Sequence, residues 1–232
     1  MDALADSITD EPRPDFYYTS TAQQTEFRCS ACNSYNDIRG KYGYCSSCGW
    51  RNSAEFQRAA LEQIRDRLVK DEVSSSDAVK QSVSEFDSAA RDYVDQLIAR
   101  VPMKESRRSQ LERLLFHNLD KFENLLTDCF DINLLRGMST DRAFIKKMFL
   151  RRHVYEHDGG VATQRYVDDS GDSNIEKGDL IRETAENAHK LIGGLNRMIS
   201  TFENDFQEIF EPEQYCIEVE KKRKRRTGGS SA

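Results

Sequence analysis

The residues with the clearest capacity for chemistry lie between positions 151 and 160, where two arginines and two histidines precede a pair of glycines. His153 and His157 are four residues apart, which places both imidazoles on nearly the same face of an α-helix. Arg152 is five residues from His157, but its long side chain can still bring the guanidinium towards that imidazole near a helix end. Histidine transfers protons near neutral pH, and arginine binds phosphate oxygens through two parallel hydrogen bonds. The segment therefore predicts a site that can hold and act on one anion.

A helix over residues 140–156 is expected to carry these groups. Apolar side chains recur there at helical spacing, whereas Lys146, Lys147 and Arg151 occupy the other positions. The paired glycines that follow supply a stop, because glycine adopts the left-handed conformation without a steric penalty. The reactive groups thus lie at the C-terminal end of a helix. If nucleic acid binds, the same three cations are its expected contacts on this helix.

An arginine, a polar residue, three further residues and a histidine, followed by Gly-Gly and a later tyrosine, resemble the R-x4-6-H motif of the HEPN superfamily (higher eukaryotes and prokaryotes nucleotide-binding domains). Arg152, His153 and His157 match the motif, and Tyr166 is the later tyrosine. The resemblance covers roughly residues 76–212. It implies a small all-α bundle that forms a homodimer in which two copies of the motif face each other. Many members of the superfamily are metal-independent ribonucleases, whereas others only bind nucleotides or nucleic acid.

The resemblance implies an endoribonuclease that cleaves RNA through attack by the 2′-hydroxyl group. Such a reaction needs a base, an acid and a cation near the transition state. We expect His157 to act as general acid or base, Arg152 to hold the phosphate, and His153 to orient the site or carry the second proton. Glu156 and Tyr166 are expected to support them. By analogy with the family, the protein would be a toxin or defence effector with an antitoxin or another protein as partner.

Other interpretations of the same residues stay open. The side chains could cap the carbonyl groups of their own helix, and histidines four residues apart also form a common metal-binding pair. The motif could also be a nucleotide-binding or dimer-interface relic. The alternative function is a non-catalytic adaptor, built from a zinc ribbon and a dimerising bundle, that binds nucleic acid or another protein. A zinc-dependent regulator whose histidines only shape an interface is a third possibility.

Two Cys-x2-Cys pairs form the second strong signal, with Cys29 and Cys32 separated from Cys45 and Cys48 by twelve residues. Four thiolates at this spacing predict one tetrahedral Zn²⁺ site with a structural role, because no coordination position is left open. Disulfides are less expected, because the acidic N-terminus is unlike a secretory signal. Basic and aromatic residues around the cysteines could contact nucleic acid, pack around the metal or dock another protein.

Hydrophobic periodicity divides the rest of the chain into helices, and strand signals are scarce, so the expected fold class is all-α: a HEPN-like helical bundle with an N-terminal zinc ribbon. The expected units are a flexible leader (1–26), a zinc ribbon (27–52), a connecting helix (53–75), the bundle (76–212) and a basic, disordered tail (213–232). Residues 161–178 are expected to form a loop. Gly193 and Gly194 interrupt the last long helix, at a cost of about 1 kcal/mol each unless close packing explains them.

Charge and hydropathy restrict the partners. The net charge is -6, and because residues 221–226 contribute six positive charges, the rest of the chain carries -12. An acidic body repels phosphate at long range, so RNA must bind at local basic features such as the helix cations or the tail. No apolar run is long enough to span a bilayer. We therefore expect a cytoplasmic protein that does not enter the membrane.

Overall fold

The computed structural model describes residues 24–114, 116 and 118–228, and it confirms a mainly helical chain with a small antiparallel pair of strands. The expected leader lies outside the described residues except for its last three, which belong to the first strand. The elements in chain order are β1 (Gln24–Arg28), β2 (Tyr35–Arg39), α2 (Ser53–Val69), α3 (Ser75–Arg100), α4 (Glu105–Glu112), α5 (Leu119–Phe130), α6 (Arg142–His157), α7 (Gln164–Ser170), α8 (Ala185–Ile209) and α9 (Gln214–Gly228).

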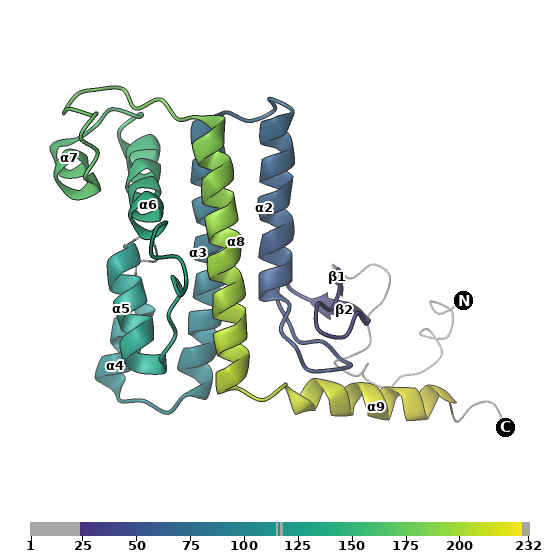
Figure 1. Cartoon of the computed structure of the whole chain (residues 1–232). Helices are drawn as coiled ribbons and strands as arrows, with labels where there is room; N and C mark the ends of the chain where they lie inside the picture. The colour runs from purple at the N-terminus through teal and green to yellow at the C-terminus, as the bar shows by residue number, and fades with distance from the viewer. Residues whose placement is uncertain (1–23, 115, 117, 229–232) are drawn as a thin grey trace.

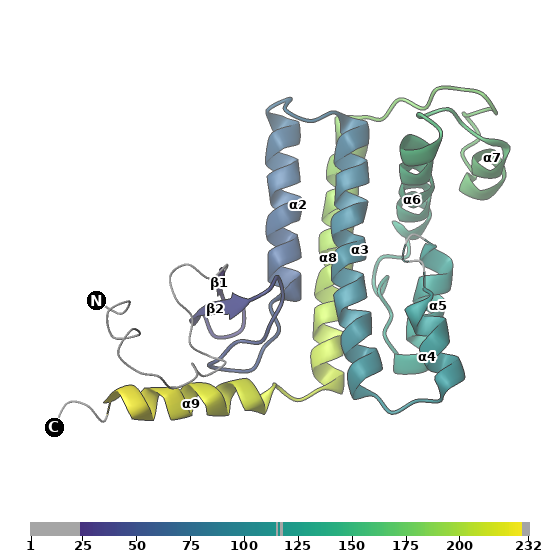
Figure 2. The same ribbon diagram turned by 180° about the vertical axis from the view of Figure 1, so that it is seen from behind.

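Three long helices, α2, α3 and α8, lie side by side and form the centre of the molecule (Figures 1 and 2). Helix α2 runs away from the strands, and α3 and α8 run back towards them. Each helix buries an apolar stripe against the others, as the periodicity predicted. The ring of Tyr93 on α3 packs against Phe202 and Phe206 on α8, with centroids 4.8 and 5.1 Å away. Helix α2 is therefore a member of the bundle, although its sequence suggested a connector.

Helices α4 to α7 cover the opposite side of α3 and place the arginine–histidine motif there (Figure 1). The ring of Phe86 on α3 packs edge to face against Phe122 on α5 and Phe149 on α6, with centroids 6.2 and 5.7 Å away. A Cβ atom on Gly194 of α8 would lie 3.1 Å from the Cδ1 atom of Ile145 on α6. Close packing of α6 on α8 therefore explains the second glycine of the pair.

The first glycine of the pair has no such explanation, which gives a prediction. A Cβ atom on Gly193 would meet nothing within 4 Å, and the residue lies inside helix α8. Gly193→Ala should therefore raise the free energy of unfolding by about 0.5–1 kcal/mol, because alanine loses less backbone entropy on folding. Urea denaturation measures the change. The matched variant Gly194→Ala should gain less or lose stability, and equal gains for both variants would contradict the packing argument.

Two segments differ from their expected structure. The predicted loop 161–178 contains α7, whose first turn is capped by the side chain of Thr163 accepting a hydrogen bond from the Tyr166 N–H group. The basic tail, expected to be disordered, contains α9. Pattern analysis missed both because α7 is only seven residues long and the basic half of α9 has no apolar periodicity.

The N-terminal residues 24–52, which we call the cysteine module, are docked on the bundle by polar contacts. Arg51 donates through Nε to Asp92 Oδ2 of α3 at 2.8 Å, and its side chain is buried. The Trp50 indole N–H group donates to Glu203 of α8 at 2.9 Å. A charged pair with two hydrogen bonds fixes orientation as well as position. The module is therefore held against the end of the bundle from which α2 starts (Figure 2).

Candidate functional site

The end of α6 has the geometry that its glycines predict. The helix ends at His157, and the chain turns through Gly159 and Gly160, which have φ angles of +60° and +85°. The Gly160 N–H group donates to the carbonyl of Val154 at 3.1 Å and so closes the helix end. A Cβ atom on Gly160 would lie 3.3 Å from Leu180 Cδ1. The turn thus brings the segment before α8 close to the last turn of α6.

The imidazoles of His153 and His157 lie beside each other, with ring centroids 4.6 Å apart and planes inclined at 52°. His157 is exposed, and His153 is half-buried. Burial lowers the pKa of His153, and the positive charge of His157 acts in the same direction. At neutral pH, His153 therefore favours the neutral form, which can accept a proton. The pair combines a sheltered imidazole with one that faces the solvent.

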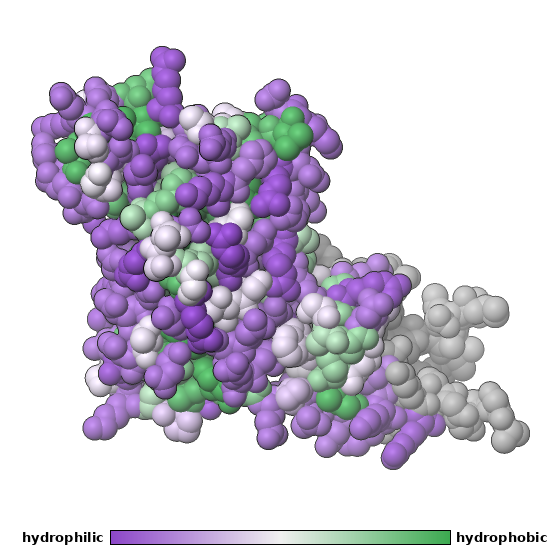
Figure 3. Space-filling model, viewed as in Figure 1, coloured by the Kyte–Doolittle hydropathy of each residue, from purple (hydrophilic) through white to green (hydrophobic). Residues whose placement is uncertain are grey.

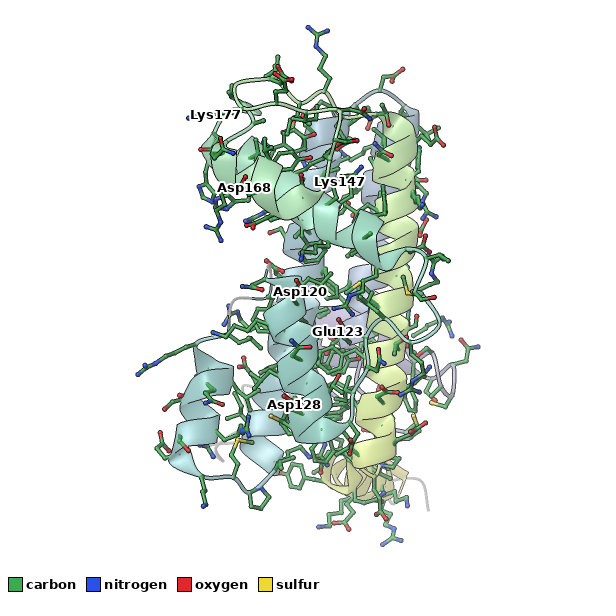
Figure 4. The ribbon with its side chains drawn as sticks, turned by 60° about the vertical axis from the view of Figure 1, so that its left-hand side comes forward. Asp120, Glu123, Asp128, Lys147, Asp168 and Lys177 are labelled. Carbon is green, nitrogen blue, oxygen red and sulfur yellow. The ribbon has the colours of Figure 1, made fainter. Side chains whose placement is uncertain are left out.

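A groove of about 650 Å³ lies between the start of α5, one face of α6, and α7. Its lining includes His153, Asp158, Lys146 and Arg165. Figure 4 shows the hollow between α7, which carries Asp168, and the start of α5, which carries Asp120. The groove is large enough for a nucleotide-sized ligand, because ligand pockets commonly have volumes of about 300–1,000 Å³. One histidine of the pair therefore borders a space in which a substrate can lie.

Arg151 is buried away from this groove, and internal partners occupy its guanidinium. Its Nε atom donates to the Tyr166 hydroxyl at 3.0 Å, Nη1 donates to both carboxylate oxygens of Glu183 at 3.1 Å, and Nη2 donates to Asp172 at 2.7 Å. The Tyr155 hydroxyl also donates to Glu183, at 3.0 Å. We call these five residues the Arg151 network. It joins α6 to α7 and to the segment before α8, so internal partners hold the guanidinium of Arg151, for which a nucleic-acid contact was expected.

Arg152 is directed towards α3. Its Nε atom is buried without a hydrogen-bond partner, and so is the Oδ1 atom of Asp87 on α3. Burial raises the pKa of Asp87 to about 6, although the positive charge of Arg152 opposes the shift. In the described part of the chain, no hydrogen bond joins Arg152 to either histidine of the motif. The structure thus brings the two imidazoles together and places the guanidinium on the adjoining side of α6.

Asp87 is a candidate site residue that sequence reasoning missed. It follows Phe86 in a helix with a continuous buried stripe, and Arg91 lies one turn later. The positive charge of Arg91 also acts on Asp87. The sequence does place Asp87 beside a buried residue and four residues before the cation Arg91. The same spacing of acid and cation also occurs on ordinary solvated helix faces, so it does not identify a site. Only the packing of α6 on α3 distinguishes the two cases.

The buried carboxylate should make stability depend on pH. The folded-state pKa of Asp87 is raised from 3.8 to about 6, so its contribution to stability is fully present below pH 3.8 and is lost as pH rises through 6. Asp87→Asn should therefore raise the free energy of unfolding at pH 7.5 relative to wild type, by roughly 1–3 kcal/mol, and the gain should vanish near pH 4. Urea titrations at both pH values measure this. The more exposed Asp95→Asn is the matched control, and a gain independent of pH would contradict the assignment.

The remaining expected site residues have different surroundings. Lys146 forms an ion pair with Asp120 at 2.7 Å within the groove lining. Lys147 lies 3.8 Å from Asp172 and so adds charge to the Arg151 network. Glu156 is exposed, and its charge acts on Lys80 of α3. Of these three, only Lys146 lines the groove.

The four cysteine sulfurs lie within 4.8 Å of one another. The Sγ atoms of Cys29 and Cys48 are 3.5 Å apart, and those of Cys32 and Cys45 are 3.6 Å apart. A tetrahedral Zn²⁺ with Zn–S bonds of about 2.3 Å separates its ligands by about 3.8 Å, which is close to both distances. The sulfurs therefore form a possible four-thiolate metal site at the spacing that the sequence predicted.

Backbone turns position these sulfurs. The Cys29 N–H group donates to the carbonyl of Ser34 at 3.0 Å, and the Cys45 N–H group donates to Trp50 at 2.7 Å. The buried side chain of Asn36 donates to the Cys45 sulfur at 3.3 Å. Hydrogen bonds of this kind orient ligands and stabilise thiolate charge around a metal. The cysteine module thus has supporting donors as well as the ligands themselves.

No family model, curated protein or solved structure matches the chain. In the part of the chain that the structure describes, no helix is both long enough and apolar enough to cross a bilayer.

Proposed function

We propose that this protein is a metal-independent endoribonuclease of the HEPN type, with its active site at the C-terminal end of α6. One observation carries the proposal: His153 and His157 place two imidazoles 4.6 Å apart, and His153 lines a groove of about 650 Å³. Two neighbouring imidazoles can supply both a base and an acid. The cations Lys146 and Arg165 in the groove lining suit a polyanionic substrate.

The proposed reaction is attack of a ribose 2′-oxygen on the adjacent phosphorus. One imidazole, His153 in its neutral form, takes the proton of the 2′-hydroxyl as the new P–O bond forms. The P–O bond to the 5′-oxygen breaks, and protonated His157 gives that oxygen a proton. The products are a 2′,3′-cyclic phosphate and a 5′-hydroxyl end. Arg152 stabilises the negative charge that builds up on the phosphate oxygens, and its guanidinium interacts electrostatically with the carboxylate of Asp87.

A homodimer is part of the proposal. Val161, which directly follows the motif, forms an isolated β-bridge with Leu180, and the exposed fractions of the two residues are 42% and 56%. A second copy of the chain that covers these two side chains would bring its own motif close to the first. Such an arrangement would explain how Arg152 of one subunit and the histidines of the other can reach one phosphate. Light scattering tests it: a monomer at micromolar concentration would contradict this part of the proposal.

We also propose that the metal of the cysteine module is Zn²⁺ and that its role is structural. Four sulfur donors match the ligand preference of Zn²⁺ and leave no position for a substrate. This role is compatible with cleavage that needs no metal at the α6 site. A toxin or defence role, with an antitoxin as partner, is a further proposal that rests on the family resemblance alone.

Cleavage of labelled RNA in EDTA tests the proposed reaction. Wild type should produce fragments with 2′,3′-cyclic phosphate ends, and His157→Ala and Arg152→Ala should each lower the rate by about 10²–10⁴-fold, the range for loss of an acid–base or charge-stabilising group. His189→Ala, a half-buried histidine of α8 outside the site, is the matched control and should stay within a few-fold of wild type. Equal rates for all four proteins would reject the ribonuclease. Tight RNA binding without cleavage would favour the non-catalytic adaptor.

A further inference from the structure

Helix α9 carries a concentrated positive charge that the proposed active site does not use. Residues 221–226 are six consecutive cations, and Lys221, Lys222 and Arg225 have exposed side chains. At 100° and 1.5 Å per residue, six helical positions surround the axis over a length of about 9 Å. Within the basic end of α9, residues 221–226, Lys221, Lys222 and Arg225 lie within about 100° of one another around the axis, so these three exposed cations share one face of the helix.

The position of α9 is set by the cysteine module. The N–H group of Glu213, just before the helix, donates to the carbonyl of Gly49 at 3.1 Å. A Cβ atom on Gly49 would lie 2.5 Å from the Glu213 nitrogen, so this approach depends on glycine. Arg100 at the end of α3 lies 3.9 Å from the Glu213 carboxylate. The helix extends along one end of the molecule, away from the α6 groove (Figures 1 and 2).

We propose that the basic end of α9 binds the phosphate backbone of RNA. For the identity of the partner, this inference rests on the proposed function. The rest of the chain carries a net charge of -12 and repels a polyanion. The six positive charges of residues 221–226 must therefore supply the long-range attraction. Neighbouring like charges also destabilise the free helix by about 0.2–0.5 kcal/mol per i,i+4 pair, and bound phosphates remove that repulsion.

Membrane binding fits the same charge less well. A helix that lies in a membrane surface needs an apolar face beside its cations, and residues 221–226 contain no apolar side chain. The apolar residues earlier in α9, Cys216, Ile217 and Val219, are half-buried. The lower edge of the molecule, where α9 lies, is hydrophilic (Figure 3). Charge alone is sufficient for RNA, because backbone binding is driven by the release of counterions.

The test measures binding of a fluorescent 20-nucleotide oligouridylate at several salt concentrations, in the His157→Ala background so that turnover is blocked. Neutralising three cations with Lys221→Gln, Lys222→Gln and Arg225→Gln should reduce the slope of log K against log salt by about 2, because each single-strand phosphate contact contributes about 0.7. Affinity at low salt should fall at least tenfold. Arg67→Gln, Lys70→Gln and Lys104→Gln remove three exposed cations elsewhere and should leave both values nearly unchanged. Lys221→Arg with Lys222→Arg should keep wild-type binding.

Equal slopes for the α9 and control triple variants would overturn the inference. So would binding to phosphatidylserine vesicles, but not to the oligouridylate, that is lost in the α9 variant. The cleavage assay is independent of this result. If His157→Ala cleaves as fast as wild type while the α9 slope changes as expected, only the ribonuclease fails; if cleavage depends on His157 and the slopes are equal, only the α9 contact fails.

Discussion

Removing the proposed Zn²⁺ from the cysteine module should unfold residues 24–52 and loosen α9 while leaving the helical bundle folded. Two five-residue strands and a few aromatic side chains are too small to be stable alone. Binding of a structural Zn²⁺ to a small module supplies an apparent free energy of about 10–16 kcal/mol, which stabilises the folded module. Polar docking contacts such as Arg51–Asp92 cannot offset the loss of that free energy. The start of α9 should loosen because Glu213 loses its fixed partner at Gly49.

Hydrogen exchange followed by mass spectrometry, with and without a strong chelator under reducing conditions, measures this effect. Protection should disappear in β1, β2 and the start of α9 and persist in α3 and α8. Cys45→Ser should reproduce the effect of the chelator. Cys129→Ser, a half-buried cysteine of α5 outside the cluster, should behave as wild type. If the strands stay protected after verified loss of the metal, the module is stable without it and the structural role is wrong.

Replacing Arg151 by leucine should lower the free energy of unfolding by about 3–5 kcal/mol, the range for removing one member of a buried ion pair. The loss is large because Glu183 and Asp172 have side chains only 0% and 7% exposed, and both would lose their cation. Arg165→Leu is the matched control, because its ion pair with Asp169 is exposed and should contribute no more than about 1 kcal/mol. Urea denaturation near pH 7 measures both variants. A loss below about 1 kcal/mol for Arg151→Leu would mean that the network is not structurally important.

The same variant should change the acid dependence of stability. Burial alone would raise the pKa of Asp172, but the hydrogen bond from Arg151 and the charge of Lys147 outweigh it, so the pKa is lowered below its usual 3.8. A carboxylate with a lowered pKa stabilises the fold above its unfolded value, and this stabilisation is lost as pH falls through the folded value. The loss of unfolding free energy caused by Arg151→Leu should therefore be largest near neutral pH and should shrink below pH 3.8. A deficit that grows towards acid would contradict the charge-pair explanation.

The two neighbouring arginines of α6, Arg151 and Arg152, have different surroundings. Arg151 ties α6 to α7 and to the segment before α8, and these elements enclose the groove together with α5. Arg152 keeps a buried Nε atom without a hydrogen-bond partner next to Asp87. Unpaired buried polar atoms are costly in a fold and are common where a ligand binds. Arg151→Leu should therefore mainly lower the free energy of unfolding, whereas the matched variant Arg152→Leu should mainly lower the rate of RNA cleavage.

The amino-acid sequence by itself determined the helical class, the approximate positions of the long helices and the four-cysteine cluster. These features depend on local rules: apolar residues at helical spacing must share one face, and two Cys-x2-Cys pairs can converge on one ion. The neighbouring positions of His153 and His157 follow from the same rule, because residues one turn apart are adjacent on any helix. Tertiary structure is not needed for any of these inferences.

Only the tertiary structure decided which residues surround each functional group of α6. Arg151 and Arg152 are adjacent in sequence, yet one is bound to Glu183 and Asp172 and the other is directed towards Asp87. The groove likewise exists because the start of α5, one face of α6 and α7 come together. Burial, ion pairing and cavities depend on which helices pack together, and that choice is made by the free energy of the whole core, which no short segment of the chain encodes.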